Sequence, residues 1–255
     1  MSLAAREATC VRDGAQVLQT VSCAVRRGAL LAICGPNGAG KSTLLRALAG
    51  LQPLVEGQIT LRGQPLTDLA PRQRARAVGY LAQAPEIAWP LAVRDLAALG
   101  RVPRAGEPRE VTAAAIDAAL STLGLNALAR RNAQSLSGGE LTRAHLARLL
   151  AGGHDFLLAD EPTTALDPGH QLEVLGTLAR LARTGLGIAV VLHDLPLAAR
   201  FCDEVLVLAQ GRVVTQGPPR DVLSPALLTE LFRIRGVWDP DGTLAGFAPL
   251  APGEA

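Results

Sequence analysis

The apolar run ALLAIC (29–34) is followed directly by GPNGAGKST, and this pair of segments constrains the fold more than any other part of the chain. The run predicts a strand buried on both faces, and STLLRALAG after it predicts a helix. The spacing G-x-x-x-x-G-K-S between a strand and a helix is typical of a loop whose backbone amides hold nucleotide phosphates. The predicted phosphate-loop residues are Gly35, Pro36, Asn37, Gly38, Ala39, Gly40, Lys41, Ser42 and Thr43.

Lys41 is the single lysine among 25 basic residues. A slim ammonium fits among phosphate oxygens where a planar guanidinium does not. We expect Lys41 to bridge the β- and γ-phosphates and the Ser42 hydroxyl to complete the shell of a Mg²⁺ ion. The alternative interpretation, a plain glycine-rich turn, is disfavoured by the strand–loop–helix context.

Length and composition fit one large domain or a domain with an inserted lobe. The chain has 255 residues, of which 49% are hydrophobic, and a formal net charge of +2. Its apolar runs fall short of the roughly 20 residues of a membrane-spanning helix, and charges interrupt its first residues where a signal peptide would be apolar, so we expect a soluble, cytosolic chain. We expect no nucleic-acid partner, because the one basic run, RQRAR (72–76), is interpreted as a solvated helix face.

The four scattered cysteines predict buried, reduced thiols.

Apolar runs alternate with helical patterns, which predicts an α/β fold with a mainly parallel sheet. Further strands are expected at 57–63, 78–83, 156–160 and 187–193, a helix over 167–185 and a hairpin over 204–217. Residues 85–155 show helical patterns without a convincing strand. We therefore expect one domain over 1–255, in which 1–84 and 156–235 form the core, 85–155 form an inserted helical subdomain and 236–255 form a C-terminal tail.

Two carboxylates follow the predicted strand FLLA. Asp160 is suited to hold Mg²⁺, and Glu161 is suited to orient and deprotonate a water molecule. His193 ends another apolar strand, where a structural histidine is the commoner reading. If that strand lies beside FLLA, His193 faces the nucleotide and can hydrogen-bond the γ-phosphate. Gln83 ends the strand VGYLAQ and has no signal of its own.

The stretch LSGGE is a capping box, in which Ser137 accepts from the amide of Glu140 and Glu140 reaches back to the amide of Ser137. With Gly138 and Gly139 just inside the helix, bare backbone amides predict a second anion site. One chain would then carry two phosphate sites.

Taken in order, GPNGAGKST, Gln83, LSGGE, FLLADEP, ALD (165–167) and His193 resemble the ATP-binding subunit of an ABC transporter, over about residues 10–235. The resemblance implies a P-loop NTPase (RecA-like) core with an N-terminal antiparallel β region and ATP and Mg²⁺ as cofactors. It also implies that Gln83 contacts Mg²⁺ and that Asp167, otherwise a plain N-cap, lies at a dimer interface. In this family two cassettes pack head to tail, so the LSGGE of one subunit faces the ATP of the other.

LAPRQRARAVGYLAQ and VLHDLPLAARFCDEVLVLAQGRVVTQGPPRDVL look like the cassettes of importers for iron–siderophore, haem and cobalamin. This similarity implies a homodimer beneath two membrane-spanning permease subunits, at the cytoplasmic face of the inner membrane, with a periplasmic binding protein as an indirect partner. The rival readings are a soluble ABC ATPase, a cassette for another cargo and a cassette without turnover. The sequence departs from the family in having no aromatic before Tyr80 to stack on adenine. Arg12 or Val11 stands near that position.

Overall fold

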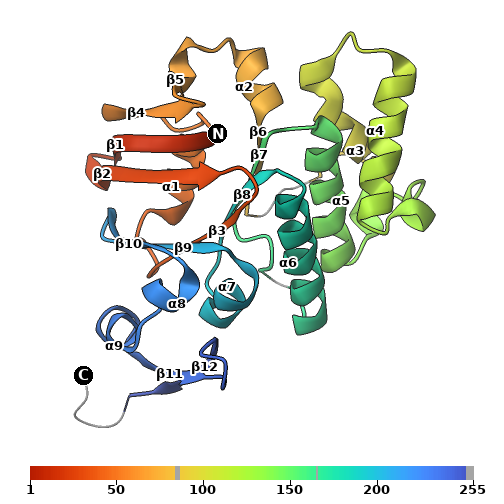
Figure 1. The fold of residues 1–255 in the computed structure, drawn as a ribbon. Helices are drawn as coiled ribbons and strands as arrows, with labels where there is room; N and C mark the ends of the chain where they lie inside the picture. Colours follow the sequence, from red (N-terminus) through yellow and green to blue (C-terminus); the bar gives the residue numbers. More distant parts are fainter. Residues whose placement is uncertain (84–86, 165, 251–255) are drawn as a thin grey trace.

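A parallel sheet forms the centre of the computed structural model, which describes residues 1–83, 87–164 and 166–250 (Figure 1). Its strand order is β10-β9-β3-β8-β7-β6, and only the edge strand β10 runs antiparallel to its neighbour. The strands are β3 (Leu30–Cys34), β6 (Val78–Leu81), β7 (Phe156–Ala159), β8 (Gly187–Val191), β9 (Glu204–Ala209) and β10 (Arg212–Gly217). The strands predicted at 29–34, 78–83, 156–160 and 187–193 and the hairpin over 204–217 are thereby confirmed, with ends that differ by a few residues, whereas the strand predicted at 57–63 lies in a second sheet.

Alternate residues of β3 enter two separate hydrophobic cores, because successive side chains of a strand point to opposite faces. Leu31 and Ile33 pack on the side of the N-terminal strands and α1 (Lys41–Leu48). Leu30, Ala32 and Cys34 pack on the other side, against α6 (Pro168–Arg183) and α7 (Leu195–Phe201). Both faces of the sheet are therefore covered, and the apolar character of these strands follows from it.

A second, antiparallel sheet has the strand order β2-β1-β4-β5, which agrees with the expected N-terminal β region. Its strands are β1 (Ser2–Arg12), β2 (Ala15–Arg26), β4 (Glu56–Leu61) and β5 (Gln64–Pro65). Short helices η1 (Leu66–Asp68) and α2 (Pro71–Ala77) then lead into β6. This sheet packs against α1, which also contacts β8 of the parallel sheet.

The inserted segment forms a helical lobe beside the core (Figure 1). Its helices are α3 (Val93–Ala98), η2 (Leu99–Arg104), α4 (Arg109–Thr122), η3 (Asn126–Leu128), η4 (Ala133–Ser135) and α5 (Gly138–Gly152). The predicted boundary at 84/85 lies outside the described residues. Within the described ranges, no helix is long and apolar enough to cross a membrane.

The C-terminal segment, expected to form a tail, contains a β-hairpin. After α8 (Pro219–Val222) and α9 (Pro225–Phe232), strands β11 (Ile234–Trp238) and β12 (Leu244–Pro249) pair antiparallel. Gly242, with φ 79°, supplies the turn, and Leu244 is 2% exposed in the core. Up to residue 250 the predicted tail thus contains a hairpin that a buried leucine anchors.

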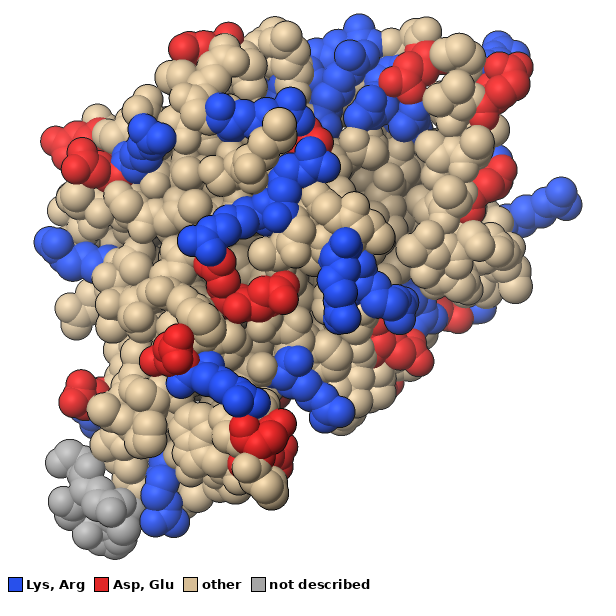
Figure 2. Space-filling view, viewed as in Figure 1, with Lys and Arg blue, Asp and Glu red and all other residues tan. Residues whose placement is uncertain are grey.

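The basic run at 72–76 is also not a purely solvated face. Figure 2 shows basic and acidic side chains mixed over one side of the molecule, with basic side chains gathered where α2 meets the lobe. Arg72 and Arg76 each donate from Nε to the carbonyl oxygen of Pro103, at 2.8 and 2.9 Å. Two of these arginines therefore join the core to the lobe. The four cysteines are buried free thiols, as predicted.

The core packing makes a stability prediction for Phe156. This side chain is 0% exposed, whereas Phe247 is 52% exposed. Phe156→Ala removes a ring from a close-packed interior and should lower the free energy of unfolding by about 3–5 kcal/mol. Phe247→Ala should change it by less than about 0.5 kcal/mol. Urea denaturation measures both, and similar losses for the two variants would contradict this account of the core.

Candidate functional site

The parallel register brings four loops to one edge of the sheet. Leu81 pairs with Ala159, Ala159 with Val190, and Ile33 with Val191, so the carboxyl ends of β6, β7, β8 and β3 lie level. Gln83, Asp160 with Glu161, His193 and the phosphate loop follow these ends. Residues far apart in the sequence thus meet at the edge where open α/β sheets bind ligands.

The phosphate loop passes tightly over β9. Gly35 has φ 147°, and a Cβ on it would lie 2.0 Å from the carbonyl oxygen of Leu208, so only glycine fits there. Lys41, which is buried, donates from Nζ to the carbonyl oxygens of Gly35 and Pro36 at 2.8 and 2.9 Å. Burial lowers the pKa of Lys41, while the nearby Glu161 carboxylate opposes that shift. The ammonium thus lies inside the loop that it would share with phosphate.

Asp160 and Ser42 form an oxygen-rich corner beside this loop. The Ser42 hydroxyl donates to Asp160 Oδ1 at 3.0 Å, and the Tyr80 hydroxyl lies 3.4 Å from Oδ2. Asp160 is 1% exposed, and this burial raises the pKa of its carboxyl group above the usual value. A cation would offset the cost of that burial, and carboxylate and hydroxyl oxygens are ligands that suit Mg²⁺. The residues present therefore fit the predicted ion.

The Glu161 carboxylate is the most heavily bonded group of the site. Its Oε1 lies 2.6 Å from His193 Nε2, and its Oε2 accepts from Gln83 Nε2 at 2.8 Å and from the Thr164 hydroxyl at 2.9 Å. Burial raises the pKa of Glu161, but these hydrogen bonds outweigh burial and leave the pKa below its ordinary value. Glu161 also has φ 50°, a left-handed conformation that costs free energy outside glycine. The surrounding bonds hold an ionised carboxylate in a fixed place.

The signature segment LSGGE lies at the start of α5 and forms the predicted capping box. The amide of Ser137 donates to Glu140 Oε2 at 2.9 Å, and the amide of Glu140 donates to Ser137 Oγ at 3.3 Å. Gly139 packs against the ring of His170, since a Cβ on it would lie 3.1 Å from that ring. Among the described residues, no hydrogen bond joins 137–140 to the phosphate loop.

Asp167 caps α6 and thereby lies close to the signature. Its Oδ1 accepts from the amide of His170 at 3.0 Å, and its Oδ2 contacts His170 Nδ1. His170 therefore links Asp167 to Gly139. Ala165, of the predicted ALD, lies outside the described residues. The side chain of Arg12, 64% exposed, lies 3.6 Å from Asp13 at the turn between β1 and β2.

Three polar residues of the site have little or no signal in the sequence. Thr164 follows DEPT without a pattern of its own, and only the left-handed turn at Glu161 brings its hydroxyl to that carboxylate. Tyr80 alternates with the buried residues of β6, and this alternation places it on the face towards α1. His170 lacks the spacing of a metal ligand. Its signal is its place three residues after the N-cap Asp167.

Removal of the Thr164 hydroxyl tests whether the bonds around Glu161 matter for turnover. If Glu161 activates water as the sequence predicts, Thr164→Val removes one of the two hydrogen bonds to Oε2 and should lower kcat for ATP hydrolysis about tenfold, or about 1.4 kcal/mol. Thr164→Ser keeps the hydroxyl and should stay within about twofold. Steady-state phosphate release measures both. Equal rates for the valine variant and the unchanged protein would remove Thr164 from the site.

Comparison with known proteins supplies the family. Residues 18–164 match the ABC transporter family profile. The chain is 46% identical to the hemin import ATP-binding protein HmuV of Nocardia farcinica, over 86% of this chain and 76% of that protein. It is 41% identical to HmuV of Bordetella avium, over 92% of this chain and 93% of that protein.

Solved structures agree in fold. A putative metal-chelate type ABC transporter in an inward-facing conformation aligns over 98% of both chains, with TM-score 0.83 and 26% identity. CbiO1 of Clostridium perfringens, part of the complex cbiONQ, aligns over 91% of this chain and 96% of its own, with TM-score 0.79 and 28% identity. The site at the edge of a RecA-like sheet, the signature segment and these matches place the chain in the ABC transporter family, as an ATP-binding subunit with ATPase activity.

Proposed function

We propose that this ATPase drives import of haem or a related iron chelate through membrane-spanning partners. The observation that supports haem as the cargo is the identity of 39–46% with several proteins named hemin import ATP-binding protein, over most of both chains. The bonded Glu161 carboxylate supports turnover over a role in binding alone, because an ordered, ionised carboxylate is what a general base requires. The identity with hemin import proteins supports import, and the Glu161 carboxylate supports ATP hydrolysis as its source of energy.

Each site residue has a role in hydrolysis. Backbone amides of residues 35–43 and the Lys41 ammonium bind the β- and γ-phosphates. Ser42, Asp160 and Gln83 would hold Mg²⁺, which when bound neutralises charge on the phosphate oxygens. Glu161 orients the attacking water and accepts its proton.

His193 and Gln83 act through Glu161. His193 holds one oxygen of that carboxylate and would meet the γ-phosphate. Gln83 holds the other oxygen and lies where β6 leaves for the lobe. A change at Glu161 when the γ-phosphate is lost would therefore be transmitted to the lobe through the side-chain amide of Gln83.

The signature serves the ATP of a second copy. Its bare amides lie at the start of α5, apart from the chain's own phosphate loop, so two copies packed head to tail would complete each other's sites. Ser137, Gly138, Gly139 and Glu140, with Asp167, would line this shared interface. ATP would then close the dimer and hydrolysis would open it.

Two permease subunits would bind the dimer at the cytoplasmic face of the inner membrane, where the cassette is a peripheral subunit. A periplasmic binding protein would deliver the cargo and act on the cassette only through the permease. The chain would not touch the cargo itself. Its kinship with hemin import proteins is therefore what supports the choice of haem.

Reconstitution tests the cargo. In proteoliposomes with a permease and a binding protein of the haem-import type, the chain should show ATP hydrolysis that haem-loaded binding protein stimulates, together with ATP-dependent haem uptake. Glu161→Gln should lower both rates by about 10²-fold or more, because it removes the base. Stimulation by a siderophore or cobalamin, with none by haem, would contradict the proposed cargo.

Mixed dimers test the shared site. Lys41→Ala spoils the phosphate grip of one chain, and Gly138→Asp places a carboxylate against the neighbour's γ-phosphate, so each homodimer has two spoiled sites. A mixture concentrates both lesions in one site and leaves the other intact, and ATP should again drive dimerisation in the Glu161→Gln background. Size-exclusion chromatography measures it. If two folded variants give no dimer on mixing, the signature does not complete the partner's site.

A further inference from the structure

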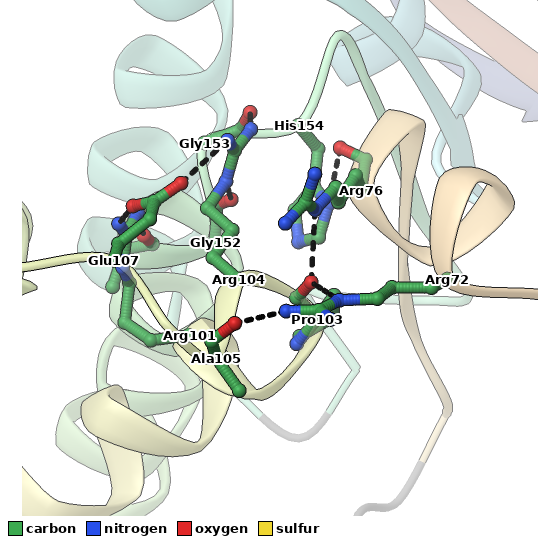
Figure 3. Close-up of polar contacts among 11 residues, drawn as sticks. Arg72, Arg76, Arg101, Pro103, Arg104, Ala105, Glu107, Gly152, Gly153 and His154 are labelled. Carbon is green, nitrogen blue, oxygen red and sulfur yellow. Dashed lines mark hydrogen bonds and ion pairs between the residues drawn. The ribbon is translucent and has the colours of Figure 1, made fainter.

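Besides the junction after Gln83, the lobe contacts the core at a place away from the phosphate loop. There η2 lies between α2 of the core and the C-terminal end of α5 (Figure 3). Gly100 of η2 approaches α5 so closely that a Cβ on it would lie 1.8 Å from the carbonyl oxygen of Arg148. Backbone therefore packs directly on backbone where η2 meets the end of α5.

Two arginines of η2 bind the last carbonyl groups of α5. Arg101 Nη1 donates to the carbonyl oxygen of Ala151 at 2.9 Å. Arg104 donates from Nε to Gly152 and from Nη2 to Gly153, both at 2.6 Å. These carbonyls have no partner within their helix, and positive charge is favourable at a helix C-terminus. The end of α5 is thereby fixed to η2.

Two arginines of α2 bind η2 from the core side. Arg72 donates from Nε to the carbonyl oxygen of Pro103 and from Nη2 to that of Ala105, and Arg76 donates from Nε to Pro103 as well. The carbonyl of Pro103 thus accepts two guanidinium groups, as Figure 3 shows. We call Arg72, Arg76, Arg101 and Arg104 the arginine clamp.

His154 fills the space beneath the clamp. A Cβ on Gly152 would lie 2.2 Å from its Nε2, and a Cβ on Gly79 of β6 would lie 2.5 Å from its Cδ2. Burial lowers the pKa of His154 to about 4, so at neutral pH the ring is uncharged and Nδ1–H can donate to the carbonyl oxygen of Arg76, 3.3 Å away. The buried ring of His154 therefore holds together the end of α5, the start of β7 and the strand β6.

One continuous segment, α5 followed by β7, carries both halves of the chemistry. It begins at the signature, which the proposed function assigns to the partner's ATP, and it ends at Asp160 and Glu161, which act on the chain's own ATP. The clamp lies at the joint between the two halves. Arg76 also directly precedes Ala77 and β6, the strand that leads to Gln83.

We propose that Arg72 and Arg76 are positioning residues for the shared ATP site. By holding η2 to the core they fix the direction of α5 relative to β7, and so place the signature for the partner's γ-phosphate. This inference rests on the head-to-tail dimer of the proposed function. It means that residues of the core outside the nucleotide site, Arg72 and Arg76, help to determine the geometry of the closed site.

The test uses the full-length chain in the Glu161→Gln background. Arg72→Ala/Arg76→Ala should raise the ATP concentration for half-maximal dimerisation about tenfold, or about 1.4 kcal/mol. Affinity for ADP in the monomer, which uses only the chain's own phosphate loop, should stay within about twofold. Arg74→Ala is the matched control, because Arg74 belongs to the same helix but its guanidinium lies near Gly50. It should leave dimerisation unchanged.

Arg72→Lys refines the test, since an ammonium keeps the charge but lacks the planar fork that reaches Pro103 from Nε and Ala105 from Nη2. It should weaken dimerisation about threefold, and it takes the place of the double variant if that one does not fold. Dimerisation of the clamp variants at the parent's ATP concentration overturns the inference. So does an equal loss in Arg74→Ala, or a matching loss of ADP affinity. If the Glu161→Gln parent itself fails to dimerise with ATP, the head-to-tail site is what fails.

Discussion

The interaction on which the site depends is the set of three hydrogen bonds to the Glu161 carboxylate. Its partners come from the ends of β6 and β8 and from the turn after β7, so the bonds exist only because these strands are neighbours in parallel register. A register shift of one residue in β8 would turn His193 to the opposite face of the sheet. The buried apolar strands therefore serve the chemistry by fixing register, and the left-handed backbone at Glu161 is maintained by the same bonds.

Much of this arrangement can be predicted from the sequence, because the decisive signals are local. A continuous apolar run such as GIAVV marks a strand covered on both faces, and GPNGAGKST marks the loop at the carboxyl end of another. Since parallel strands share one edge, the amino-acid pattern places Asp160 and Glu161 there, and it places His193 there on the condition, which the structure meets, that its strand pairs with FLLA. The capping box at Ser137 and Glu140 is equally local, and its hydrogen bonds are those predicted.

The parts that cannot be predicted depend on contacts with backbone or on distant packing. Arg72 and Arg76 have the pattern of a solvated face because their partners are carbonyl oxygens of Pro103 and Ala105, which any residue type could offer. Thr164 gains its role from the backbone turn at Glu161. The C-terminal hairpin has a weak signal because its strands are mostly half exposed, and one buried residue, Leu244, anchors them.

In the proposed head-to-tail dimer, geometry explains why the joint between α5 and β7 would need charged clamps as well as apolar packing. With 15 residues, α5 is about 22 Å long, so a tilt of about 5° at its end would move the signature by about 2 Å. A hydrogen bond to phosphate tolerates only a few tenths of an ångström around its best length. Apolar packing is non-directional and permits small tilts, whereas a guanidinium bound to two carbonyls fixes direction. In the proposed head-to-tail dimer, a cassette whose two half-sites lie on one segment would therefore concentrate its directional bonds at the bend between them.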